Sequence, residues 1–168
     1  MIAWEKIDNK TFENLAFDYM SSNYPDIRWE KTKLTNDGNK DGESIISALP
    51  FNTTIKYWYE AKYSININKS IPKSHLDSTL VSSLLDGHVV VIAFITNAYI
   101  SEDYKRRADI FARKRDNLKI YYINGEEIEN WLSENPTIED KYFHTISAQK
   151  YCIEDKIETV CFMDKYDC

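Results

Sequence analysis

Apolar positions along the chain alternate between helical and strand spacings. Near the N-terminus, five of them recur at i, i+3, i+4, i+7 and i+8, which predicts the buried stripe of a helix that ends before Pro25. This stripe consists of Phe12, Leu15, Ala16, Tyr19 and Met20. The later pattern predicts strands over 27–34, 44–49 and 54–62, a helix after Pro72, a strand over 88–96, a helix from Ser101, a strand over 118–123 and a helix over 126–132.

Turn and capping residues add local detail to these elements. A polar loop over 35–42 should follow the first strand, residues 50–52 should close a hairpin, and Asn124-Gly125 should form a turn. Ser101 is placed to cap the helix that it begins, and Ser74 and Asp77 are placed like a capping pair. For the helix after Pro72 we expect a buried stripe made of Leu76, Leu80, Val81, Leu84 and Leu85.

The strand over 88–96 is almost wholly apolar and β-branched, which is typical of a strand covered on both faces. Such strands lie in parallel sheets between layers of helices. A hairpin-rich first half followed by β-α-β crossovers therefore predicts an α/β fold, in which a mixed central β-sheet is flanked by α-helices on both faces.

The length of 168 residues suits one domain, and a composition of 43% hydrophobic and 29% charged residues suits a globular one. Beyond Glu134 the signals weaken to a weak helical pattern over 146–153 and a weak strand pattern over 157–163. We therefore expect a core over residues 1–133 and a C-terminal extension over 134–168. The extension would be the edge of the domain or the start of a linker to a further module of a longer chain.

No membrane or export segment is expected. The longest apolar run covers the seven residues 89–95, against the roughly 20 needed to span a bilayer, and the N-terminus lacks a basic segment followed by an apolar one. The three cysteines, Cys152, Cys161 and Cys168, are an odd number without a Cys-x-x-Cys pair. A reduced, cytoplasmic chain is the simplest interpretation.

The net charge of −6 is unevenly distributed. Residues 124–168 carry −7, so the first 123 residues carry +1, and the segments 56–73 and 102–119 each carry +3. Such segments can meet phosphates, although a charge run is more often a solvated helix face. The candidate phosphate contacts are Lys105, Arg106, Arg107, Arg113, Lys114 and Arg115. The histidines, His75, His88 and His144, lack the spacing of a zinc site.

One group of polar residues could carry chemistry. Asp41 ends the polar loop, and Glu60-Ala61-Lys62 ends the strand that should pair across the hairpin. Because side chains alternate along a strand, Glu60 and Lys62 must point to the same face. Two carboxylates at such a place can hold Mg²⁺, which would polarise a phosphodiester and lower the pKa of a bound water, while the lysine orients that water or offsets charge on the phosphate.

This arrangement resembles the PD-(D/E)xK nuclease superfamily, and the wider sequence looks most like its Mrr-type restriction endonuclease branch. The resemblance covers roughly residues 10–132. It consists of Phe12-Glu13, Asp37-Gly38-Asn39-Lys40-Asp41-Gly42, Glu60-Ala61-Lys62, Ile95-Thr96-Asn97-Ala98, and Ile123-Asn124-Gly125 before Trp131-Leu132.

By this resemblance the fold is the restriction-endonuclease-like three-layer fold. Asp41 and Glu60 are metal ligands, Lys62 is the catalytic lysine, and Glu13 is an auxiliary acid supporting the metal or its water. The implied activity is Mg²⁺- or Mn²⁺-dependent cleavage of DNA in prokaryotic defence. Cutting both strands needs two sites, so a homodimer or a higher homo-oligomer is expected.

The sequence departs from the family pattern in two places. Asn39 stands where the family usually shows a second glycine, so Asp37 or Glu43 could replace Asp41 as the metal acid. No second module for target recognition is evident. Two other functions stay open at this point: a non-catalytic nucleic-acid-binding or assembly module of the same fold, and a nuclease that cuts RNA or branched DNA.

Overall fold

The computed structural model describes residues 2–32, 40–48, 53–115 and 117–144. Its elements are η1 (Trp4–Lys6), α1 (Asn9–Asn23), β1 (Glu30–Lys31), β2 (Gly42–Ala48), β3 (Thr53–Lys62), α2 (Lys73–Asp86), β4 (Val89–Thr96), α3 (Glu102–Arg113), β5 (Lys119–Ile123), α4 (Gly125–Glu134), α5 (Pro136–Glu139) and η2 (Asp140–His144). None of the described helices is long and apolar enough to cross a membrane.

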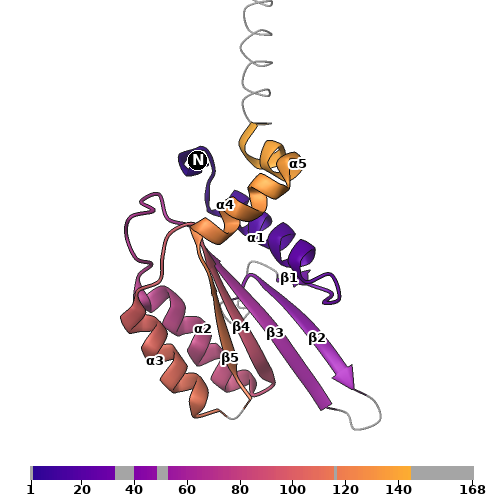
Figure 1. The fold of residues 1–168 in the computed structure, drawn as a ribbon. Helices are drawn as coiled ribbons and strands as arrows, with labels where there is room; N and C mark the ends of the chain where they lie inside the picture. Colours follow the sequence, from indigo (N-terminus) through magenta and orange to yellow (C-terminus); the bar gives the residue numbers. More distant parts are fainter. Residues whose placement is uncertain (1, 33–39, 49–52, 116, 145–168) are drawn as a thin grey trace, which may run out of the picture.

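The strands form one mixed sheet in the order β1-β2-β3-β4-β5 (Figure 1). β1, β2 and β3 pair antiparallel, whereas β4 is parallel to both β3 and β5. The five residues from Ile92 to Thr96 in β4 are all buried, so the expected central strand covered on both faces is confirmed.

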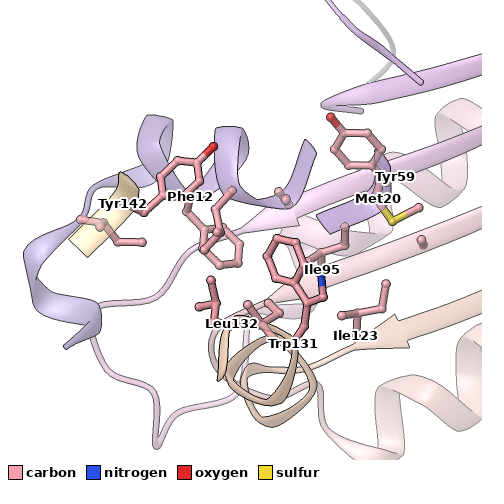
Figure 2. Close-up of a cluster of buried hydrophobic side chains, with 14 of the residues drawn as sticks. Phe12, Met20, Tyr59, Ile95, Ile123, Trp131, Leu132 and Tyr142 are labelled. Carbon is pink, nitrogen blue, oxygen red and sulfur yellow. The ribbon is translucent and has the colours of Figure 1, made fainter. Parts of the chain in front are cut away.

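Helices cover both faces of this sheet, each over its own hydrophobic core. On one face α1 and α4 pack on the sheet, and Figure 2 shows Phe12, Ile95, Trp131 and Leu132 of this core. On the other face α2 and α3 pack over Trp58, Ile92 and Phe94. The expected α/β architecture of three layers around a mixed sheet is therefore confirmed.

Two of the three expected N-terminal strands are confirmed, as β2 and β3. The first one is short, because within the described part of the expected strand over 27–34 only Glu30 and Lys31 pair, with Glu43 and Gly42. The hairpin loop at 50–52 and the weak patterns over 146–153 and 157–163 lie outside the described residues.

The expected capping and buried stripe of α2 are partly wrong. The helix begins after Pro72, which supplies no side-chain cap, so Ser74 and Asp77 do not act as a capping pair. Leu76 and Leu80 are buried as expected, but the other three members of the stripe, Val81, Leu84 and Leu85, are 55%, 47% and 85% exposed.

Two small polar residues of α2, Thr79 and Ser83, are fully buried in place of those three. The Ser83 hydroxyl donates a hydrogen bond to the Leu80 carbonyl at 2.7 Å, so this polar group enters the core with its hydrogen bond made. A hydroxyl that is hydrogen-bonded to its own helix can be buried. A prediction from hydrophobicity alone therefore gave the wrong buried face for part of α2.

The expected Asn124-Gly125 turn is a helix start instead. The Asn124 side chain accepts a hydrogen bond from the Glu127 N–H, and the Glu127 side chain accepts one from the Asn124 N–H, so α4 begins with a capping box. Gly125 opens the helix because a Cβ there would lie 2.3 Å from the Asn97 carbonyl oxygen.

Two short helices, α5 and η2, follow α4 where the sequence signals are weak. Tyr142 and Phe143 of η2 are buried in the core beside α1, and the Tyr142 hydroxyl donates a hydrogen bond to Asp18 at 2.8 Å. The packed part of the chain thus reaches η2, while the division at residue 133 stays a prediction.

Candidate active site

The predicted site residues meet where β2 begins and β3 ends. The register pairs Gly42 with Tyr59, which places Asp41 beside the last residues of β3. The Asp41 N–H donates a hydrogen bond to the Tyr59 carbonyl at 3.0 Å. The Asp41 carboxylate accepts one from the Ala61 N–H at 2.7 Å, so Asp41 is fixed against the backbone between Glu60 and Lys62.

Glu60 and Lys62 share one face of β3, as strand alternation requires. Their side chains form an ion pair in which the Glu60 side chain is 3% exposed and that of Lys62 is 29% exposed. A buried carboxylate is stable when a cation and hydrogen bonds compensate its lost hydration. The Lys62 ammonium supplies part of this compensation.

Glu13 comes from α1 and lines a cavity of about 370 Å³, here called the site cavity, together with Glu60 and Lys62. Burial raises the pKa of the Glu13 carboxyl, and the negative charge of Asp41 raises it further, while Lys62 opposes both effects. The three acids and the lysine thus influence one another electrostatically, and the structure brings all four predicted site residues together.

The pKa of Lys62 reflects the same cluster. Burial alone would lower it, but the carboxylates of Glu60, Asp41 and Glu13 outweigh burial and raise the pKa above its ordinary value. Lys62 is therefore a cation at neutral pH, and it lines the site cavity together with two acids, Glu13 and Glu60.

Lys40 directly precedes Asp41 and is held in place by several contacts. It is only 8% exposed, and its ammonium lies 4.2 Å from the centre of the Trp58 ring and 2.6 Å from a Glu43 carboxylate oxygen. Its carbonyl accepts a hydrogen bond from the Thr32 hydroxyl at 2.6 Å. These contacts hold the turn that carries Asp41.

The alternatives to Asp41 as metal acid fare differently. Glu43 directs its carboxylate to Lys40, at 2.6 Å, whereas Asp41 directs its carboxylate to the Ala61 N–H between Glu60 and Lys62. Asp37 lies outside the described residues. Among the described acids of this loop and strand, Asp41 has the position that the sequence analysis favoured.

The space around Gly42 explains why a glycine follows Asp41. A Cβ at this position would lie 2.1 Å from the ring of Tyr59, so a larger residue would push Tyr59 or the strand aside. Tyr59 is fully buried on the face of β3 opposite Glu60. Burial is the main cause that raises the pKa of its phenol, and the negative charge of Asp41 raises it further.

The donor set suits a hard divalent cation. Mg²⁺ and Mn²⁺ prefer carboxylate and water oxygens, and Mg²⁺ is usually held by one or two carboxylates with waters and phosphate oxygens. Glu60, which lines the site cavity, and Asp41, which is bound to the N–H of the neighbouring Ala61, supply two such carboxylates. Within the described ranges, no group of three or more His, Cys, Asp or Glu side chains is placed to hold a metal ion together.

Three residues of α2 also line the site cavity, and the sequence pattern did not predict them there. These are Ser74, His75 and Ser78, on the first two turns of the helix. The spacing of the histidines indicates neither a zinc site nor a histidine nucleophile, and isolated residues carry no spacing signal. The one available signal was that a helix start should follow Pro72, close in sequence to Lys62.

Three of the six basic candidates on and after α3 make contacts within the protein. Lys105 pairs with Glu102 and Arg106 with Asp103, each three residues apart on the same helix. Arg115 donates a hydrogen bond to the Ser83 carbonyl at 2.8 Å. These contacts fit the solvated helix face better than a phosphate-binding surface.

No protein-family model matches the chain, and no curated protein matches it. Among solved structures, the MspJI restriction endonuclease in complex with a 27-mer oligonucleotide is similar, with 14% identity, a TM-score of 0.47, and coverage of 71% of this chain and 26% of that chain. The DNA modification-dependent restriction endonuclease AspBHI is similar with 17% identity, a TM-score of 0.49, and coverage of 86% and 40%.

The chain spans less than half the length of each of these two structures. At such identities and TM-scores, the likeness says nothing about activity. What this chain does has to be inferred from its own residues.

Proposed function

We propose that the chain is a metal-dependent DNA endonuclease of the PD-(D/E)xK type. The observation that carries this proposal is the hydrogen bond from the Ala61 N–H to the Asp41 carboxylate. It ties Asp41, just before β2, to the backbone between Glu60 and Lys62. Two carboxylates and a lysine are thereby brought together at the end of β3.

In this proposal Asp41 and Glu60 hold Mg²⁺ or Mn²⁺. When bound, the cation would polarise the phosphodiester and lower the pKa of a water. Lys62 donates hydrogen bonds that orient the attacking water and offsets negative charge that grows on the phosphate. The attacking water loses a proton as its oxygen forms a bond to phosphorus, one bridging P–O bond breaks, and the displaced deoxyribose oxygen takes up a proton.

Glu13 supports this arrangement from α1. It lines the site cavity opposite the end of β3, and its raised pKa shows that its carboxyl senses both burial and the charge of Asp41. We assign it the role of an auxiliary acid that accepts a hydrogen bond from a metal-bound or attacking water.

The finer assignments are part of the same proposal. We infer an Mrr-type nuclease domain of a cytoplasmic prokaryotic defence protein, with DNA as its substrate. Because cutting a duplex through both strands takes two active sites, we infer a homodimer or a higher homo-oligomer in the working state.

The test is a substrate panel: supercoiled plasmid, linear duplex DNA, branched DNA and single-stranded RNA, each incubated with Mg²⁺, Mn²⁺ or EDTA. The proposal predicts cutting of plasmid and duplex that EDTA abolishes. Cutting of RNA alone or of branched DNA alone would mean that the chain is a nuclease whose substrate is not ordinary duplex DNA. Binding without cutting, at every protein concentration and with either metal, would favour the silent binding module and contradict the proposal.

A further inference from the structure

A second cavity adjoins the site cavity and is here called the flanking cavity. It measures about 810 Å³ and shares Asn9, Tyr63 and His75 with the site cavity. Its other lining residues include Ser64, Ile65 and Asn66. A molecule whose reacting phosphate lies at Lys62 would therefore have its next unit near the three shared residues.

The loop over 64–70, between β3 and α2, forms one wall of this cavity and is fixed in place. The side chain of Asn97, only 3% exposed, accepts a hydrogen bond from the Ser64 N–H at 2.7 Å and donates one to the Ser64 carbonyl at 2.8 Å. The Asn66 carbonyl accepts further hydrogen bonds from the Ser64 hydroxyl and the Lys69 N–H. The loop conformation is thus set before any ligand arrives.

This fixed loop presents apolar side chains to water. Ile65 is 84% exposed and lines the flanking cavity, whereas Ile67 is 40% exposed and lies outside the cavity lining. Single exposed apolar residues are common on protein surfaces, so exposure alone does not indicate a binding site. Ile65 differs because it lines a cavity that shares three lining residues with the site cavity.

The chemistry of the lining fits a nucleobase better than a second phosphate. Ile7, Ile71 and Pro72 offer apolar surface, while Glu5 and Asp8 place two acids in the lining against Lys10 as its one lysine. Acids repel a phosphate but accept hydrogen bonds from the amino groups of cytosine and adenine. The volume lies in the range of cavities that hold small molecules.

We propose that the flanking cavity binds the base of a nucleotide next to the scissile phosphate, with Ile65 packing against it as the base leaves its stack. This inference rests on the proposed nuclease function and adds a base-contacting site to it. Apolar wedges inserted between base steps unstack them in other DNA-binding proteins, and unstacked bases are held by apolar contacts and edge hydrogen bonds.

The test uses a duplex in which 2-aminopurine, whose fluorescence rises when it unstacks, replaces every adenine of one strand. The full chain is added in Ca²⁺ to block cutting, and anisotropy of an end label reports saturation. Ile65→Ser is compared with Ile67→Ser, a matched change on the same loop outside the cavity. Both residues are exposed, so neither change should disturb the fold.

The native chain and Ile67→Ser should raise the fluorescence at saturation, whereas Ile65→Ser should not, and it should bind roughly tenfold more weakly. Saturated binding of the native chain without a rise would overturn the inference while leaving the nuclease intact. An equal rise with Ile65→Ser and Ile67→Ser would overturn it as well. A native chain that neither binds nor cuts DNA would sink the proposed function, and this inference with it.

Discussion

The Asp41 carboxylate accepts a hydrogen bond from the backbone N–H of Ala61 at 2.7 Å. This contact joins the start of one strand to the end of its neighbour, at the residue between Glu60 and Lys62. The position of Asp41 relative to those two side chains is thus set by sheet pairing, which is among the most rigid relationships a fold can provide. Preorganisation of this kind is what an electrostatic catalytic site requires.

Replacing Asp41 should separate its structural role from its metal-binding role. In Asp41→Asn the amide oxygen can still accept the Ala61 N–H, so the free energy of unfolding should fall by less than about 1 kcal/mol. Asp41→Ala should lose about 1–2 kcal/mol more, because the N–H then has no acceptor. Both should bind Mn²⁺ at least about tenfold more weakly, since a carboxylate ligand is gone.

Urea unfolding and calorimetric Mn²⁺ titration measure these two effects. Native-like Mn²⁺ affinity in Asp41→Asn would mean that Asp41 is not a ligand.

The Glu60–Lys62 pair should be coupled in stability. Lys62→Met removes the ammonium from beside a carboxylate that is only 3% exposed. It should cost about 2 kcal/mol, less than for a fully buried pair, because Lys62 itself reaches water. Adding Glu60→Gln should restore part of this loss, because the buried charge is then gone. A double-mutant cycle by urea unfolding checks the coupling, and strictly additive losses would refute it.

Gly42→Ala should disturb the site through Tyr59. The new Cβ would lie 2.1 Å from the ring, so overpacking should cost about 1–3 kcal/mol and shift Asp41 away from β3. The control is Gly87→Ala at the end of α2, where φ is +73° and nothing crowds the new Cβ. It should cost about 1 kcal/mol of backbone strain and leave Mn²⁺ affinity unchanged. Equal Mn²⁺ affinity in both variants would contradict the role given to Gly42.

Tyr59 should make the fold sensitive to alkali. Burial raises the pKa of its phenol above the ordinary 10.0, so the folded chain keeps a proton that the unfolded chain loses. This contribution is complete below pH 10 and is lost as the pH rises through the folded pKa. Tyr59→Phe should therefore lose stability less steeply above pH 10, by up to about 1.4 kcal/mol per pH unit.

At pH 7 the same variant should be as stable as the native chain or up to about 1 kcal/mol more stable, because the buried hydroxyl finds no hydrogen-bond partner within the described residues. Thermal unfolding between pH 7 and 11 measures both effects. A curve for Tyr59→Phe that parallels the native one above pH 10 would show that Tyr59 does not carry this sensitivity.

The sequence predicts the parts of the fold that depend on strong periodicity. Strand alternation requires Glu60 and Lys62 to share a face, and an unbroken apolar run marks β4 as the buried centre. Hairpin pairing then brings Asp41 to the end of β3. These relationships involve neighbours along a strand or across a hairpin, so local pattern suffices to predict them.

Other features depend on contacts that no local pattern encodes. The buried face of α2 is set by what α3 and the sheet offer, and Ser83 is buried because its hydroxyl bonds to its own helix. His75 reaches the site cavity only because α2 starts beside the end of β3. The pairing of Glu43 with Lys40 likewise follows from the packing of Lys40 on Trp58.

The most direct test of the account is the rate of plasmid cleavage with Mg²⁺ by four matched variants. Lys62→Met and Asp41→Asn change the site. Lys56→Met and Asp86→Asn make the same chemical changes in an ion pair of 2.6 Å outside the site cavity, with Lys56 on the same strand face as Lys62. The two site variants should cut about 100-fold more slowly or not at all, as expected when an electrostatic group of an active site is lost. The two controls should cut at nearly the native rate. Site variants that cut as fast as their controls would contradict the central claim that Asp41, Glu60 and Lys62 form the catalytic site.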